Sequence, residues 1–176
     1  MTGAVGAPKA SGVERVSYFA GQLLGTSDFV DEQNYFRTRL RRRNLYLHGA
    51  GVVSGLRVTL ARATSAGGQN VVVDPGFALD PRGEEIEVCQ DTAVPLPLQG
   101  QILFVQLLYV ERPTAPVPSP GPAGNTPGEE QAFSRVEETF TVVLTAVARA
   151  DAVSIARLTF RRGRWQVDHG FQPQRA

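Results

Sequence analysis

The residues best suited to chemistry in this chain form an acidic cluster near the middle of the sequence. They are Asp74, Asp80, Glu84, Glu85 and Glu87. Neighbouring carboxylates can act as general acid and base or hold a hard cation. Turn chemistry explains them better, because Asp74 and Asp80 each precede a proline and Glu85 and Glu87 alternate along one strand face. The spacing also misses the calcium-loop pattern, so we predict neither a catalytic nor a metal site here.

The remaining candidates for nucleophiles and metal ligands are isolated. His48 and His169 lie far apart, with no cysteine or carboxylate at ligand spacing. Cys89 is the only cysteine, so an intrachain disulfide or a zinc cluster cannot form, and we expect a buried or incidental thiol. The glycines around Ser54 follow a helical pattern instead of leading into one, unlike a nucleophile elbow or a phosphate loop. We therefore predict a protein that is not an enzyme and has no cofactor.

The bulk composition is typical of one soluble globular domain. The 176 residues are 42% hydrophobic and carry a formal net charge of +1, which gives no overall field for nucleic acid or an anionic membrane. Residues 1–15 lack the apolar core of a secretory signal, and the run 102–110 is too short to span a bilayer. We expect a protein that is cytoplasmic when made, does not bind nucleic acid and does not insert directly into a membrane.

Residues 26–48 have the pattern of one long amphipathic helix. Thr26 or Ser27 is placed to cap the first turn, and acidic residues precede basic ones, which opposes the helix dipole. Gly49 and Gly51 are placed to end the helix. Apolar side chains recur at helical spacing, and we predict that they form a buried stripe: Phe29, Phe36, Leu40 and Leu47.

After the helix, the apolar period changes to that of β-strands. We predict strands at 56–60 and 71–73, and a hairpin of 77–79 with 85–88 around the turn Asp80-Pro81-Arg82-Gly83. The almost continuous apolar run 102–111 predicts a strand in the middle of a sheet. Further strands are predicted at 135–147, 154–160 and 165–167. The predicted fold class is α+β, a mostly antiparallel β-sheet with one long amphipathic N-terminal helix.

Composition divides the chain into one domain with loose segments. Residues 1–13 predict a flexible N-terminal tail, and residues 14–172 a single α+β domain. Within it, residues 113–128 are rich in proline and predict an exposed loop. Residues 173–176 predict a loose C-terminus.

The basic half of the predicted helix is the strongest candidate for binding. Its residues are Arg37, Arg39, Arg41, Arg42 and Arg43, followed by His48. Nucleic-acid binding is one interpretation of such a run, but the chain is nearly neutral and the first half of the helix is acidic. A solvated helix end or a protein interface, where arginine is favoured, explains the run better. Our hypothesis is that these residues lie at an interface.

The order of motifs between residues 16 and 90 resembles that of a small structural protein family. The motifs are F-x-G-Q-x-L at 19–24, LHGAGVVSGLRV at 47–58 and DPGFALDPRGEEIEV at 74–88. We associate this family with gene clusters for phage-tail-like contractile injection systems and related tail or baseplate proteins. The resemblance implies a non-enzymatic structural or assembly subunit in or near the baseplate, with no catalytic, cofactor or metal residues.

The resemblance also implies partners. Other subunits of the same particle (baseplate, tube or sheath proteins) would contact this chain, which would be present in multiple copies in a symmetric assembly. The particle would be released or docked to a membrane. The alternative is a ligand- or glycan-binding β-domain of a tail-fibre-like protein. It requires an exposed aromatic platform, for which Tyr109 and Trp165 are the candidates.

Overall fold

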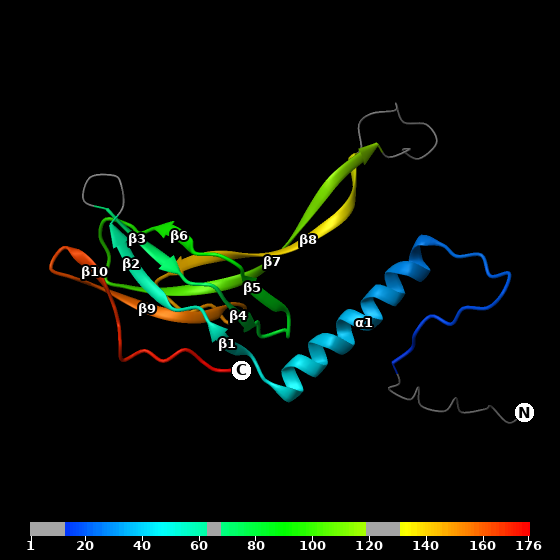
Figure 1. The fold of residues 1–176 in the computed structure, drawn as a ribbon, viewed down its shortest axis with the longest axis horizontal. Coiled ribbons are helices and arrows are strands. Elements are labelled where there is room, and N and C mark those ends of the chain that lie inside the picture. The colour runs from blue at the N-terminus through cyan, green and yellow to red at the C-terminus, as the bar shows by residue number, and fades with distance from the viewer. Residues whose placement is uncertain (1–12, 63–67, 119–130) are drawn as a thin grey trace, which may run out of the picture.

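The computed structural model describes residues 13–62, 68–118 and 131–176. Within these ranges, helix α1 (Thr26–Leu47) is followed by ten strands (Figure 1). The strands are β1 (Gly51–Gly55), β2 (Val58–Arg62), β3 (Gln69–Val73), β4 (Gly76–Leu79), β5 (Glu85–Val88), β6 (Thr92–Pro95), β7 (Ile102–Pro118), β8 (Gln131–Thr145), β9 (Val153–Arg161) and β10 (Arg164–Val167). Neighbouring strands pair antiparallel. The predicted fold class is confirmed.

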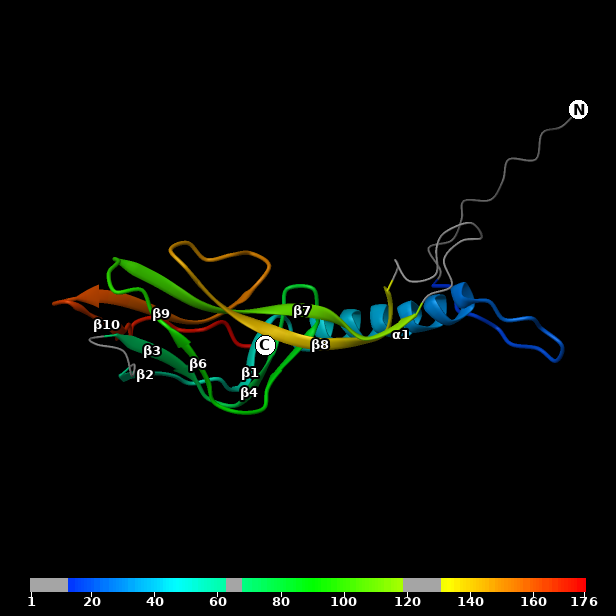
Figure 2. The same cartoon turned by 90° about the horizontal axis from the view of Figure 1, so that it is seen from above.

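The strands form two layers (Figure 2). One is a four-stranded sheet in the order β10-β9-β7-β8, so the predicted central position of β7 is correct. The other consists of two three-stranded sheets, β1-β4-β5 and β2-β3-β6. These two sheets follow one another along the same chain segments. Backbone bonds from Leu56 N to Pro75 O (3.2 Å) and from Asp74 N to Arg57 O (2.9 Å) carry the ladder across the break. The second layer is therefore three long strands that bend together.

The hydrophobic core lies between the layers. The side chains of Val71 and Val73 from β3 are buried against Val105 and Leu107 from β7 and Leu158 from β9. The alternating pattern of each strand supplies these inward residues. Polar Gln106 is also fully buried, and hydrogen bonds satisfy its side-chain amide. The amide nitrogen donates to Arg149 O (3.1 Å) and Ser154 Oγ (2.9 Å), and the amide oxygen accepts from Arg149 N (3.0 Å). Gln106 thus fixes the connection between β8 and β9.

Two glycines of the motifs allow close backbone packing where the second layer bends. A Cβ at Gly55 would overlap the backbone of Pro75, and a Cβ at Gly76 would overlap the backbone of Ser54 and Leu56. Only residues without a side chain allow β1 and β4 to approach this closely. The family-like motifs at 47–58 and 74–88 therefore encode packing.

Helix α1 and one end of the β7–β8 pair extend away from the two layers on the same side (Figures 1 and 2). β7 and β8 pair as far as Pro118 with Gln131. β9, by contrast, pairs with β7 only between Ile102 and Leu107. We call the two-stranded part, residues 111–118 and 131–138, the β7–β8 ribbon.

Several predictions about segment ends were wrong. The strand β7 runs through residues 113–118, which were predicted to be loop. Beyond Leu107 one side of β7 is an open edge, and edge strands are where sheets accommodate proline. The predicted tail 1–13 and the rest of the predicted loop lie almost wholly outside the described residues.

The two ends of the domain also differ from prediction. Gly25, one residue before Thr26, is the N-cap of α1, and its N–H donates to the Asp28 carboxylate (2.8 Å). The C-terminal residues are not loose, because Val52 N donates to Gln174 O (2.8 Å) and Arg175 forms a parallel bridge to Val52. This tail covers the open edge of β1. The helix ends at Leu47, before the glycines, as predicted.

Candidate interaction surface

A polar joint holds the C-terminal half of α1 against the strands. The buried amide of Asn44 donates to Gly83 O (3.0 Å) and Glu85 Oε1 (3.2 Å) in the β4–β5 hairpin. Arg41 forms an ion pair with Glu84 in the same hairpin. Arg37 forms ion pairs with Glu111 at the start of the ribbon and with Glu84 (3.7 Å). The face of α1 that meets the strands is therefore polar.

The joint perturbs the ionisable groups that form it. The hydrogen bond from Arg37 holds the pKa of the Glu111 carboxyl below its usual range, although burial acts in the opposite direction. The same contact raises the pKa of Arg37. Burial, followed by the nearby carboxylates of Glu138 and Glu84, raises the pKa of Tyr109. These groups are all in their ordinary charge states at neutral pH, so the joint is a set of ion pairs with no poised acid or base.

The apolar stripe of α1 is exposed, which contradicts the prediction that it is buried. Phe29, Phe36, Leu40 and Leu47 are between 45% and 67% exposed. At about 100° per residue, the four side chains fall within roughly 40° of one another on the helix surface. Arg37, Arg41 and Asn44 lie about a quarter-turn away and take the position against the strands. The helix turns its polar side inward and leaves its apolar side open.

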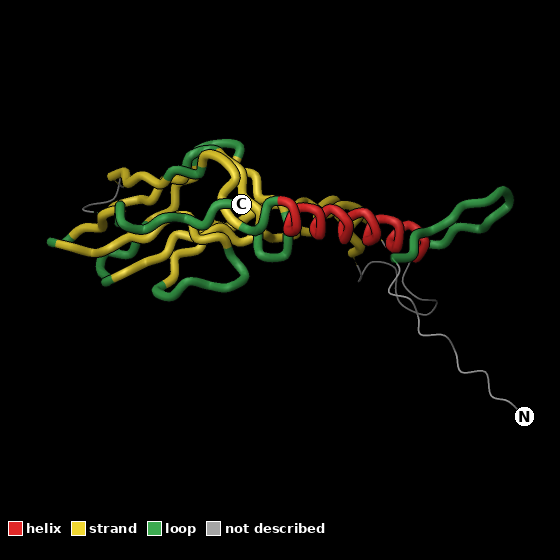
Figure 3. The backbone as a smooth tube through the Cα atoms, turned by 90° about the horizontal axis from the view of Figure 1, so that it is seen from below, coloured by secondary structure: helices red, strands yellow, loops and turns green. Residues whose placement is uncertain are grey.

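A second apolar feature precedes the helix, at the end of the helix that is far from the two layers (Figure 3). We call residues 18–24 the tip. Its turn is closed by Gln22 N donating to Phe19 O (3.2 Å) and Phe19 N donating to Gln22 Oε1 (3.2 Å). The Tyr18 hydroxyl ties the tip to α1 by donating to Glu32 (2.7 Å). Leu23 is 95% exposed, and Phe19 is also largely exposed. The F-x-G-Q-x-L motif thus builds an ordered turn that presents apolar side chains to solvent.

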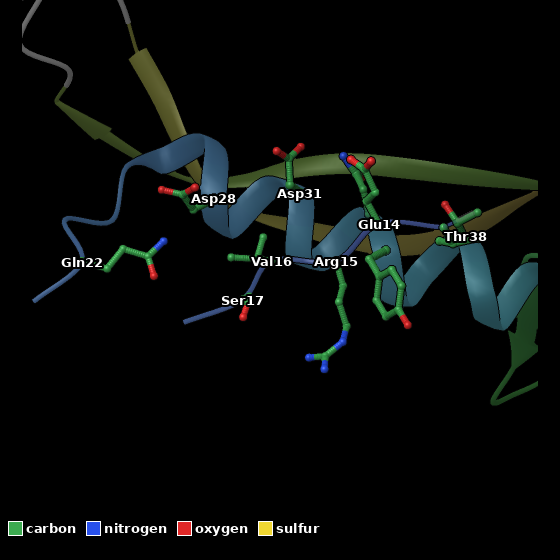
Figure 4. Close-up of a pocket in the computed structure, with 11 residues that line it drawn as sticks. Glu14, Arg15, Val16, Ser17, Gln22, Asp28, Asp31 and Thr38 are labelled. Carbon is green, nitrogen blue, oxygen red and sulfur yellow. The ribbon is translucent and has the colours of Figure 1, made fainter. Parts of the chain in front are cut away.

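Residues 13–17 run back along another side of α1 and enclose an open hollow of about 630 Å³. Figure 4 shows Glu14, Arg15 and Val16 lying over the helix, with Asp31 and Thr38 projecting from it. The hollow is wide and bounded by exposed side chains, and its carboxylates do not converge on one point. It is the gap between a strap and a helix.

The predicted interface residues divide between two sides of α1. Arg37 and Arg41 lie in the polar joint and contact the chain's own carboxylates. On the other side, Arg39 donates to the Tyr35 hydroxyl (3.0 Å), and the Arg42 guanidinium lies 5.8 Å from the centre of the Tyr46 ring. Arg43 lines a hollow with Arg39 and Arg42. The hypothesis that this run is an interface stays a prediction, and the structure brings only Arg39, Arg42 and Arg43 together on the outer side.

His48 lies just beyond the last helical turn. It is the C-cap, and its backbone N–H donates to Asn44 O (3.0 Å). Its backbone therefore caps the end of the helix.

The ribbon also carries exposed apolar side chains. Phe133 and Val136 of β8 and Val117 of β7 are exposed. The register of β7 and β8 is the same on both sides of Ala115, which has a positive φ of 54° and whose carbonyl accepts from Ser134 Oγ (3.1 Å). Two-stranded ribbons are marginal in water on their own, so a covering surface would stabilise this one.

The described residues place the candidate metal-binding and catalytic carboxylates. They contain no group of three His, Cys, Asp or Glu side chains that could hold a metal ion. Asp80 is fully buried, but its carboxylate is occupied by the backbone N–H groups of Arg82 and Glu84 (2.8 Å each). Of the helices that the structure describes, none is long and apolar enough to cross a membrane.

The aromatic platform required by the glycan-binding alternative is not exposed. Tyr109 is 6% exposed and Trp165 is 2% exposed, and the Trp165 indole donates to Pro97 O (2.7 Å) inside the fold. Both rings belong to the core, so the idea that they form a surface platform is wrong.

Comparisons with known proteins identify the fold. No protein-family model matches the sequence, and no curated protein matches it. Among solved structures, the chain is similar to one described as a crystal structure of TssK, with a TM-score of 0.55 and 12% identity over 92% of this chain and 42% of that one. It is also similar to a chain of the type VI secretion system TssK-TssF-TssG baseplate subcomplex, with a TM-score of 0.57 and 15% identity over 92% of this chain and 62% of that one.

A third match, in a structure described as the baseplate complex from the type VI secretion system, has a TM-score of 0.55 and 15% identity, and covers 92% of this chain and 41% of that one. This chain therefore spans less than two thirds of the length of the solved chains it matches. At such low identity the likeness concerns the fold alone. The chain has the fold found in part of TssK and in chains of type VI secretion baseplate complexes.

Proposed function

We propose that this chain is a non-enzymatic structural subunit of a contractile, phage-tail-like injection particle, located in or near its baseplate. The observation that carries the proposal is the reversed polarity of α1, which is fixed to the strands by ion pairs and turns its apolar stripe to solvent. A monomer that worked alone would have no use for this arrangement, because large exposed apolar patches mark interaction sites.

The similarity in fold supports the proposal that this chain belongs to a contractile injection particle. The similar chains come from structures of type VI secretion baseplates, and the motifs at 19–24, 47–58 and 74–88 led to a contractile-injection family independently of the fold. The partners would be other subunits of the same particle, with several copies of this chain in a symmetric assembly. The protein would be cytoplasmic when made and then incorporated into the particle.

The tip is the part of this surface best placed to reach a neighbouring subunit. It lies at the end of α1 away from the strands, and Leu23 and Phe19 make few contacts with the rest of the described chain. An apolar side chain on an ordered turn loses little conformational entropy on docking, which favours it as an interface anchor.

The test is recovery of the particle with a tagged copy of the full chain from cells that make the whole system, imaged by negative-stain electron microscopy. We expect sheathed tubular particles with the native sequence and their loss with Leu23→Ala. Leu98→Ala is the matched control, because Leu98 is also highly exposed (74%) but lies in the connection between β6 and β7. A monodisperse protein without partners in the native sequence would refute the proposal. Equal loss of particles with both variants would refute the role of the tip.

A further inference from the structure

We propose that the apolar stripe of α1 is covered by the same stripe of a second copy of this chain, with the two helices antiparallel. The stripe consists of Phe29, Phe36, Leu40 and Leu47, and no described part of the chain covers it. This inference adds to the proposed function by naming one partner for this surface. It leaves the tip available to other subunits.

The stripe is symmetric end to end. Its residues are separated by seven, four and seven positions, which is the same sequence of intervals in both directions. When two such helices lie antiparallel, Phe29 faces Leu47 of the partner and Phe36 faces Leu40 of the partner. Each level then combines one aromatic and one aliphatic side chain, which fills the space between helices better than two aromatic rings at the same level. A two-fold axis near residue 38 makes the contact self-complementary.

The charges on α1 favour the antiparallel arrangement over the parallel one. The first turns carry Asp28, Asp31 and Glu32, and the later turns carry Arg39, Arg42 and Arg43 on the outer side. None of these six side chains forms an ion pair with another described residue. Parallel helices would place acidic turns beside acidic turns and basic beside basic. Antiparallel helices place the acidic half of one copy beside the basic half of the other.

One cross-helix pair is specified by this geometry. Glu32 and Arg43 lie on the same side of the stripe, within roughly 20° of each other around the helix axis. They also lie at almost equal distances from residue 38. In the antiparallel pair, Glu32 of each copy is therefore level with Arg43 of the other, at the edge of the apolar contact. The two-fold axis creates this contact twice.

Other elements leave room for the second helix. The polar joint occupies the side of α1 with Arg37, Arg41 and Asn44, and the strap of residues 13–17 lies against the side with Asp31, Asn34 and Thr38. The stripe lies on the side between them that neither covers.

The size of the contact sets its strength. A 22-residue helix is about 33 Å long, and one helix face buries less than the roughly 800 Å² per partner of a standard interface. We therefore expect dimers in the micromolar range that form readily when a particle holds copies close together.

Analytical ultracentrifugation of the full chain over a range of concentrations tests the pairing. We expect a concentration-dependent dimer that is lost in Leu40→Asp and retained in Leu98→Asp, the control on a distant exposed leucine. Glu32→Arg and Arg43→Glu should each weaken the dimer by about tenfold or more, because each creates two like-charge contacts. The double variant Glu32→Arg/Arg43→Glu should restore it, even though it lacks the bond to Tyr18. A monomer at all concentrations, or a double variant no better than the single ones, overturns the proposal.

Cross-linking tests the direction of the helices. Cys89 is exposed and must first be replaced by serine. In that background, a mixture of Phe29→Cys and Leu47→Cys chains should form a mixed disulfide, whereas Phe29→Cys alone should not, because its two thiols would lie at opposite ends of the pair. A disulfide from Phe29→Cys alone overturns the antiparallel arrangement. A monomeric chain whose tip still recovers particles would refute this pairing while leaving the proposed function intact.

Discussion

Replacement of Gly83 by alanine tests the attachment of α1 to the strands. Gly83 closes the β4–β5 turn with a positive φ of 85°, and a Cβ at this position would overlap the backbone carbonyl of Arg41 in α1. A backbone group cannot rotate away, so the helix must shift. The shift pulls Asn44 away from the Gly83 carbonyl and Arg41 away from Glu84.

Gly163 supplies a control with the same conformational penalty and no clash. It lies in the β9–β10 turn with a φ of 76°, and a Cβ there meets nothing within 4 Å. Alanine in the left-handed region costs about 1–2 kcal/mol at either position. Loss of the buried hydrogen bonds of Asn44 adds about 1–3 kcal/mol at Gly83 alone. The difference between the two variants therefore isolates the attachment of the helix.

Two measurements separate the helix from the strands. Trp165 is the only tryptophan and is buried, so its fluorescence during urea unfolding reports the free energy of unfolding of the two-layer core. Hydrogen exchange of amides 37–47 reports the opening of the helix. We expect Gly83→Ala to lower the fluorescence-derived free energy of unfolding by about 1–3 kcal/mol more than Gly163→Ala does. Gly83→Ala should in addition lower protection of the helix amides by a further factor of about 5 to 150. Equal helix protection in both variants would refute the idea that Gly83 positions α1.

Other consequences can be measured with single substitutions. Leu158→Ala should lower the free energy of unfolding by about 2–5 kcal/mol, whereas Leu23→Ala on the tip should change it by less than about 0.5 kcal/mol, as measured by urea unfolding. Because Arg37 lowers the folded-state pKa of Glu111, this pair contributes stability at neutral pH that is lost as pH falls through that lowered pKa. Glu111→Gln should therefore make the urea midpoint less dependent on pH below about 4.3, and an unchanged pH dependence would contradict the ion pair. Gln106→Leu should cost about 1–3 kcal/mol, because the part-buried groups that Gln106 bonds lose their partner, and should speed proteolysis between β8 and β9; unaltered proteolysis would show that Gln106 does not hold that connection.

The β4–β5 hairpin could be predicted because its determinants are local. The carboxylate of Asp80 accepts from the backbone N–H groups of Arg82 and Glu84, and Gly83 takes the positive φ that ends the turn. Turn residues of this kind have the same conformational preferences in most folds. The central position of β7 was also predictable, since a strand that is apolar on both faces needs cover on both.

The exposed stripe on α1 could not be predicted from periodicity. Spacing shows that Phe29 and Phe36 share a face, but it does not show whether the same chain or another one covers that face. Arg37, Arg41 and Asn44 also recur at helical spacing, and they form the polar face of α1 that contacts the strands. This polar face could be recognised as the packed one only from the fold, because its partners Glu84 and Glu111 are distant from the helix in sequence.

The reversed polarity of α1 has a consequence for its own stability. Helices in water are marginal unless an apolar face packs, and tertiary contacts supply most of their stability. In α1 those contacts are concentrated between Arg37 and Asn44. Among the described residues, the first three turns are held only by the Gly25–Asp28 cap, the bond from Tyr18 to Glu32 and the strap of residues 13–17. The half of the helix nearest the tip is therefore the part that gains most from a partner. A partner that covers Phe29 and Phe36 stabilises the helix and orients the tip at the same time, which couples pairing of this chain to the docking of the tip on its neighbours.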